Sequence, residues 1–119
     1  MIKDLNSPEQ FDALLQVSQA CPVFLFKHST ACFTSSYAWR QFQRCAESES
    51  RAEYWCVRVL EQRALSQHVA RQTNVQHESP QALLFHHGRV VWHDSHEGIT
   101  IGALQKSLAT VLAGAGVSE

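Results

Sequence analysis

The stretch LFKHSTACFTSSYAWRQF, residues 25–42, places a cysteine where a buried strand ends and a helix begins. The run PVFLFKH at 22–28 is apolar without alternation, which is typical of a strand covered on both faces of a sheet. Residues 34–46 then carry apolar side chains at helical spacing. Cys32 lies between these two segments, where the unpaired amides and dipole of a helix N-terminus favour a thiolate.

Ser35 stands three residues after this cysteine, so the motif is C-x-x-S and not the C-x-x-C of a dithiol. A serine can donate a hydrogen bond to a thiolate, but it cannot close an internal disulfide. We therefore predict that Cys32 is a lone redox nucleophile whose mixed disulfide waits for an external thiol. The alternative is a small buried core residue, because free cysteines are often buried. The position at the strand-to-helix turn favours the reactive interpretation.

Five neighbours are predicted to support the thiolate. Lys27 and His28 precede it closely and would add positive potential. Ser29, Thr30 and Ser35 would offer hydroxyl donors to the sulfur.

The rest of the chain alternates helices and strands. We expect helices at 8–19, 34–46, 61–73 and from Thr100 until Gly114 and Gly116 stop the last one, and strands at 22–28, 53–60, 81–86 and 89–94. The order αβαβαββα requires a parallel pair followed by a hairpin. It predicts a single α/β domain over residues 1–119 with a thioredoxin-like mixed four-stranded sheet and helices on both faces.

Pro80 opens the third predicted strand, a position where its missing N–H matters least. An ordinary trans proline is the general expectation for any X-Pro bond. In a thioredoxin-like sheet, however, this is the place of the cis-proline that faces the active cysteine. We therefore predict that the backbone of Ser79 and Pro80 pairs with an extended substrate segment.

Bulk properties exclude several classes of function. The 119 residues are 45% hydrophobic with a formal net charge of -1, and they carry no basic or acidic run. This argues against nucleic acid or an anionic membrane as the main partner. The first ten residues lack the apolar core of a signal peptide, and no apolar run approaches the roughly 20 residues that span a bilayer. We expect a cytoplasmic protein.

The other cysteines and the histidines are predicted to be structural. Cys45 and Cys56 fit core positions, and Cys21 lies at the opposite end of its strand from the candidate nucleophile. We expect no metal site, because the cysteine spacings match no zinc motif and adjacent histidines on a strand point to opposite faces. His96 is expected to order the loop before the last helix, and Trp39 to pack or to line a partner surface.

Three motifs carry a resemblance to a known family: KHSTACFTS at 27–35, HESPQALLF at 77–85 and WHDSHEGIT at 92–100. In this order and spacing, the chain resembles the monothiol bacilliredoxins, thioredoxin-like proteins also labelled general stress proteins. The resemblance covers nearly the whole chain. One departure concerns the residue after the active cysteine, which is proline in the family's C-P-x-S motif and Phe33 here; this affects the redox tuning of the cysteine.

The resemblance implies reduction of mixed disulfides between protein cysteines and bacillithiol, with Cys32 carrying the small-thiol adduct. Bacillithiol would be a co-substrate, with glutathione or another low-molecular-weight thiol as the alternative, and no cofactor would be tightly bound. The partners would be S-thiolated client proteins. Two other functions remain open: a redox-inactive adaptor that binds extended segments, and a sensor in which thiol modification is itself the signal.

Overall fold

The computed structural model describes residues 1–29 and 33–117, and of these the side chains of residues 33, 34 and 115–117 are not described. The elements in order are β1 (Ile2–Asp4), α1 (Pro8–Val17), β2 (Val23–His28), α2 (Phe33–Ser48), β3 (Glu53–Arg58), α3 (Arg63–Thr73), β4 (Gln81–His86), β5 (Arg89–Ser95), the 3-10 turn η1 (His96–Gly98) and α4 (Ile101–Val117).

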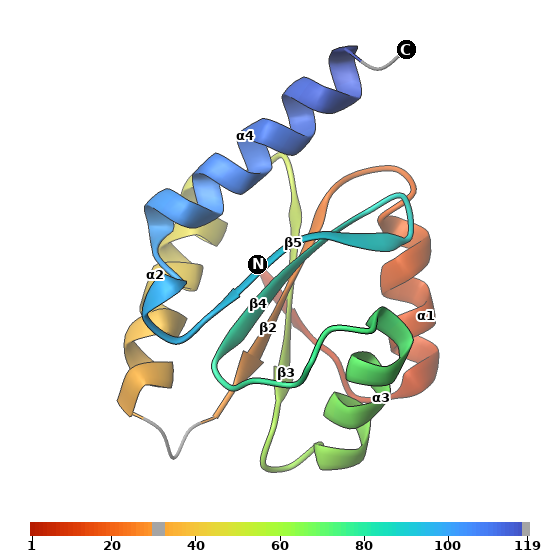
Figure 1. Cartoon of the computed structure of the whole chain (residues 1–119), viewed down its shortest axis with the longest axis vertical. Coiled ribbons are helices and arrows are strands. Elements are labelled where there is room, and N and C mark those ends of the chain that lie inside the picture. The colour runs from red at the N-terminus through yellow and green to blue at the C-terminus, as the bar shows by residue number, and fades with distance from the viewer. Residues whose placement is uncertain (30–32, 118–119) are drawn as a thin grey trace.

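The strands form one mixed sheet in the order β1-β3-β2-β4-β5. The first three of these are parallel, whereas β4 runs antiparallel to β2 and β5 antiparallel to β4. Helices α1 and α3 lie on one side of the sheet, and α2 and α4 lie on the other (Figure 1). The expected thioredoxin-like α/β arrangement is therefore confirmed.

Alternate residues of the central strands build two separate cores. Val23 and Leu25 face α1 and α3, whereas Phe24 and Phe26 face α2 and α4. All six residues of β2 are buried, which explains its unbroken apolar run. The one charged side chain in that run, Lys27, is fully buried among the described residues.

The sheet has five strands, so the prediction of four was wrong. The missing strand is β1, an edge strand whose three residues pair with Tyr54, Trp55 and Cys56 of β3. It carries one apolar residue in three and is mostly exposed, so it has no periodic pattern by which a sequence would reveal it.

The helix limits differ in detail from the prediction. Helix α4 continues through Gly114 to Val117, although two glycines were expected to stop it. Gly114 is exposed and a Cβ there would meet nothing, so glycine only weakens this last part of the helix. The N-terminal signals were correct: the hydroxyl of Ser7 accepts from the amide of Gln10 at 3.1 Å, and that of Thr100 accepts from Ala103 at 3.1 Å.

Candidate active site

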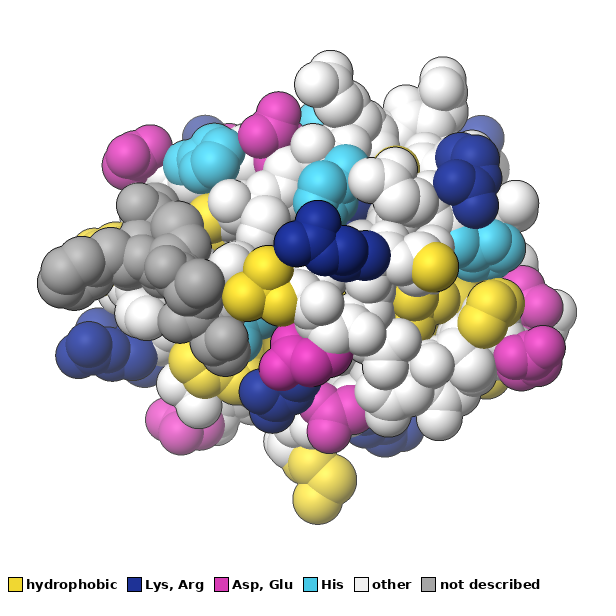
Figure 2. Space-filling model, turned by 90° about the horizontal axis from the view of Figure 1, so that it is seen from below, with side chains coloured by type: hydrophobic (Ala, Val, Ile, Leu, Met, Phe, Trp, Pro, Cys, Tyr) yellow, Lys and Arg dark blue, Asp and Glu magenta, His cyan; other side chains and the backbone are white. Residues whose placement is uncertain are grey.

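The candidate site lies at the edge where the parallel strands β2 and β3 end, which is the usual ligand edge of an open α/β sheet. Ser29 follows the end of β2 at this edge, and Ser35 lies in the first turn of α2. Cys32 and Thr30 lie outside the described residues, so their predicted roles stay predictions. Figure 2 views the molecule from this edge and shows acidic, basic and histidine side chains interspersed on it.

Ser35 ties the end of β2 to the start of α2. Its side chain is fully buried, and Oγ lies 2.7 Å from Nδ1 of His28 and accepts the backbone N–H of Ser29 at 3.0 Å. The His28 ring stacks on Trp39 of α2, with ring centroids 4.9 Å apart and planes at 14°. These contacts fix both ends of the segment that carries the predicted nucleophile.

The roles of His28 and Ser35 toward the Cys32 thiolate stay predictions, but the contacts of these two residues limit what each can offer a thiolate. Burial and the nearby Arg58 lower the pKa of His28, so the ring is neutral at pH 7 and adds no positive charge. When the ring proton is on Nε2, the Ser35 hydroxyl must donate to Nδ1 and has no proton left for a thiolate. When the ring proton is on Nδ1, the hydroxyl proton is free. The tautomer of His28 thus decides whether Ser35 can serve the sulfur.

Lys27 points to the other face of the sheet. Its Nζ donates to Nδ1 of His77 at 3.1 Å, in the segment between α3 and β4. Burial lowers the pKa of Lys27 to about 8, partly opposed by the Glu78 carboxylate. Burial and Lys27 itself lower the pKa of His77. At pH 7 the pair is therefore one cation hydrogen-bonded to a neutral ring, placed at the same sheet edge.

The peptide bond between Ser79 and Pro80 is cis, as the position of this proline in the fold suggested. Its surroundings are ordered by η1: the His96 amide donates to the Pro80 carbonyl at 3.1 Å, and His96 Nε2 lies 3.1 Å from Oε1 of Glu78. His96 was expected to order the loop before the last helix; it lies in η1 just before α4 and bonds this loop to the segment that carries the cis-proline. The role of Ser79 and Pro80 in binding a substrate segment stays a prediction.

The three cysteines that the structure describes are free and placed as expected. Cys45 is buried in the core between α2 and the sheet, 3.6 Å from the Tyr54 hydroxyl, and burial raises the pKa of its thiol. Burial raises the pKa of Cys56 to about 12. Burial, followed by Glu53, also raises the pKa of Cys21, which comes just before β2 at the far end of that strand. None of these three is activated for exchange at neutral pH.

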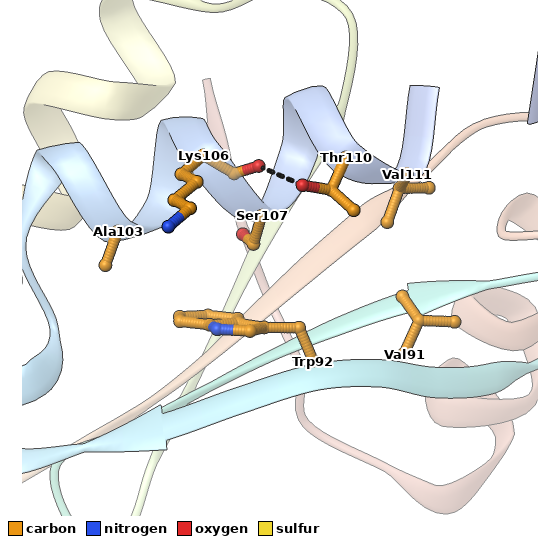
Figure 3. Close-up of a pocket in the computed structure, with 7 residues that line it drawn as sticks. All are labelled: Val91, Trp92, Ala103, Lys106, Ser107, Thr110 and Val111. Carbon is orange, nitrogen blue, oxygen red and sulfur yellow. Dashed lines mark hydrogen bonds between the residues drawn. The ribbon is translucent and has the colours of Figure 1, made fainter. Parts of the chain in front are cut away.

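A hollow lies between α4 and β5 (Figure 3). It has a volume of about 270 Å³ and is bounded by Val91 and Trp92 on the strand and by Lys106, Thr110 and Val111 on the helix. The Thr110 hydroxyl already donates to the Lys106 carbonyl at 2.9 Å. This hollow contains no thiol and none of the predicted site residues.

Neither a metal centre nor a membrane span is found in the part of the chain that is described. Across residues 1–29 and 33–117, no three His, Cys, Asp or Glu side chains form a group that could hold a metal ion. Within the same residues, no helix combines the length and apolarity that crossing a bilayer requires.

Two contacts at this edge were not predicted from the sequence. The partner of Lys27 is His77, fifty residues later, and no spacing rule connects them. Trp39 was expected to pack or to line a surface, but its stacking on His28 depends on where α2 lies over β2. Within HESP at 77–80, the sequence predicted a role for the proline, whereas no sequence pattern indicated a partner for His77.

Comparisons with known proteins agree with this architecture. Residues 3–104 match the family described as monothiol bacilliredoxin BrxC. A solved structure described as a candidate oxidoreductase with a thioredoxin fold is 34% identical, with a TM-score of 0.80 over 89% of this chain and 92% of that one. Two thioredoxins share the fold at low sequence identity. Thioredoxin from Malassezia sympodialis is 16% identical, with a TM-score of 0.75 over 92% of this chain and 90% of that one. Thioredoxin from Trypanosoma brucei brucei is 15% identical, with a TM-score of 0.78 over 95% of this chain and 92% of that one.

Proposed function

The chain belongs to the monothiol bacilliredoxin family, and we propose that it removes a low-molecular-weight thiol of the bacillithiol type from protein mixed disulfides through Cys32. The observation that carries the proposal is the setting of Ser35. This residue occupies the place of a resolving thiol, and from the start of α2 its oxygen is bonded to His28 and Ser29 at the end of β2, which joins the two ends of the β2–α2 connection. The other three cysteines are held protonated at neutral pH, which leaves Cys32 as the candidate nucleophile.

The proposed reaction has two thiol–disulfide exchanges. The Cys32 thiolate attacks the small-thiol sulfur of the mixed disulfide, a new S–S bond forms, and the client cysteine leaves as a thiolate that takes a proton from water. A second molecule of the small thiol then attacks the adduct as its thiolate. It forms the symmetric small-molecule disulfide and returns Cys32 to its reduced form. In the net reaction the client cysteine is reduced and one free small thiol is oxidised, since the other small thiol is already at the disulfide level in the mixed disulfide.

This function requires no bound cofactor, with bacillithiol or a related thiol acting as co-substrate. The partners are S-thiolated proteins, which would lie along Ser79 and Pro80. A cytoplasmic location supplies such clients and keeps the thiol pool reduced.

The test is the intact mass of the reduced protein after mixing with bacillithiol disulfide or, separately, glutathione disulfide. We expect one adduct in the wild type and in Cys21→Ser, and none in Cys32→Ser. The disulfide that reacts faster identifies the co-substrate. A folded wild-type protein that forms no adduct at pH 7 with either disulfide would overturn the proposal and support the adaptor function instead.

A further inference from the structure

His96 combines an uncommon backbone conformation with two contacts to the segment that carries Pro80. Its φ is 56°, in the left-handed region that glycine adopts more easily than a residue with a Cβ. Its amide donates to the Pro80 carbonyl at 3.1 Å, and its Nε2 lies 3.1 Å from Oε1 of Glu78. The turn is thus fixed against Pro80 in a conformation that disfavours a side chain, yet an imidazole is present at this position.

Glu78 is the carboxylate that is paired with this ring. Asp94, at the end of β5, is engaged within the turn, since its Oδ1 accepts the Ser95 amide at 2.8 Å and a Cβ at Gly98 would overlap with its carboxylate. Glu97 is exposed and makes no hydrogen bond to the ring in the part of the chain that is described. The His96 and Glu78 side chains are 44% and 41% exposed, so a ligand can reach both.

A carboxylate on one ring nitrogen orients a histidine for proton transfer. With Nε2–H donating to Glu78, the pair holds the ring in place and stabilises the imidazolium form. The second ring nitrogen, Nδ1, has no hydrogen-bond partner among the described residues. It is therefore the atom that can give and take a proton.

The pair lies where the proposed reaction releases a thiolate. The client segment is proposed to lie along Ser79 and Pro80, and His96 is bonded to the residues on either side of Ser79. Each of the two exchanges moves a proton as well as a disulfide bond, because thiols react and leave as thiolates. A proton carrier at this place would act in both exchanges.

We propose that His96 is a further catalytic residue that carries the proton of the two exchanges, with Glu78 as its orienting carboxylate. The inference rests on the proposed function. In the first exchange, the departing client thiolate takes the proton from Nδ1 of the imidazolium in place of water. In the second exchange, the incoming small thiol gives its proton to Nδ1 as its sulfur attacks the adduct on Cys32. The proton of the small thiol ends on the client cysteine, and His96 returns to its starting form.

The test varies the leaving thiol and keeps the small thiol constant. Two mixed disulfides of bacillithiol are compared, one with a cysteine peptide and one with thionitrobenzoate, whose thiolate leaves at pH 7 without taking a proton. His96→Asn retains a residue that tolerates the left-handed conformation and can donate to Glu78, but asparagine cannot carry a proton. The rate of Cys32 adduct formation is followed by intact mass.

We expect His96→Asn to react about tenfold more slowly with the peptide compound, a small factor for general acid catalysis because a thiolate already leaves readily. With the thionitrobenzoate compound it should react at the wild-type rate. His96→Gly, which keeps the backbone conformation without the side chain, should behave in the same way. Glu78→Gln should slow the peptide reaction about threefold, because the amide accepts the ring N–H without stabilising its charge.

His87→Asn is the matched control. His87 is an exposed histidine with the same left-handed backbone, at φ 55°, and it lies at the opposite end of the sheet. This variant should match the wild type with both compounds.

Equal slowing of His96→Asn with the two compounds would overturn the proposal, because the substitution would then act on the fold or on the attacking thiol. Unchanged rates with both would overturn it as well. The thionitrobenzoate compound needs no proton from His96, so its adduct at Cys32 tests the proposed function alone. An adduct from that compound together with an unchanged peptide rate in His96→Asn would leave the function supported and the role of His96 refuted.

Discussion

Ser35 is the residue on which the start of α2 depends. Its hydroxyl oxygen is hydrogen-bonded both to the His28 ring and to the Ser29 amide. Ser35 and His28 are buried, and Ser29 is half-buried. Serine at this position therefore does two things. It omits the second thiol of a dithiol enzyme, and it replaces that thiol with a stronger hydrogen-bonding group that holds the connection in place.

Ser35→Ala should reveal the structural part of this role. The substitution leaves Nδ1 of His28 and the Ser29 amide without their partner, and each unsatisfied buried group is destabilising by about 1–3 kcal/mol. We expect the free energy of unfolding to fall by about 2 kcal/mol in urea denaturation. Ser36→Ala, at the exposed next position of the same helix, is the matched control and should stay within about 0.5 kcal/mol of the wild type. Equal stability of the two variants would show that water replaces the serine hydroxyl at no loss.

Lys27 is a buried cation whose charge opposes folding. Its pKa falls from 10.5 in the unfolded chain to about 8 in the fold, so the unfolded state binds more protons between these values. The contribution of Lys27 is therefore unfavourable below pH 8 and is relieved as the pH rises toward 10.5.

Lys27→Met tests this sign. We expect the variant to be at least as stable as the wild type at pH 7, because methionine fills the volume without a buried charge. Between pH 7 and pH 10 the wild type should gain about 2 kcal/mol relative to the variant, since one pKa unit corresponds to about 1.4 kcal/mol. Urea denaturation of both proteins at the two pH values measures this difference in the free energy of unfolding. Both proteins contain the same buried thiols, so the effect of thiol titration cancels when they are compared. A variant that is less stable at pH 7 by several kcal/mol would show that the contact with His77 outweighs desolvation.

At the scale of elements, the sequence predicts what is periodic and misses what is short. Strands β2, β3, β4 and β5 are found because each is a run of apolar or β-branched residues between turn signals. Strand β1 carries no such pattern, and it exists because β3 offers it a free edge. The same limit applies to the site: the position of Ser35 follows from the motif, but its bond to His28 depends on how α2 lies over the sheet.

Strand β1 is short, yet the residue after it is part of the core. Leu5 is 1% exposed, belongs to the same core cluster as Leu14 and Val57, and donates its amide to the Cys56 carbonyl at 2.8 Å. Leu5→Ala should lower the free energy of unfolding by about 3 kcal/mol through the cavity that it leaves. Leu60→Ala, at a leucine that is 43% exposed, is the control and should change it by less than about 1 kcal/mol. Thermal or urea denaturation measures the two changes. A loss of stability in Leu5→Ala as small as that in the control would contradict the prediction, because it would mean that β1 can detach without destabilising the fold.

At the scale of the whole molecule, two cores share one set of strands. The α1–α3 face holds Trp55, and the α2–α4 face holds Trp39 and Trp92. Because β2, β3 and β4 send alternate residues to the two faces, neither core can be formed without ordering the backbone of the other. The candidate site is built from both faces at once, since Lys27 is bonded on the α3 side and His28 on the α2 side.

This sharing predicts a single cooperative unfolding transition. Leu14→Ala on one face and Leu104→Ala on the other should each lower the free energy of unfolding by about 3 kcal/mol, because both side chains are fully buried. Unfolding can be followed by tryptophan fluorescence in two parent proteins, one that keeps only Trp55 and one that keeps only Trp39 and Trp92. Each leucine substitution should lower the free energy of unfolding by the same amount in both parents. If Leu104→Ala shifted only the transition seen through Trp39 and Trp92, the α2–α4 face would unfold on its own. The β2–α2 connection would then open without global unfolding, and exchange at Cys32 would be limited by that local opening.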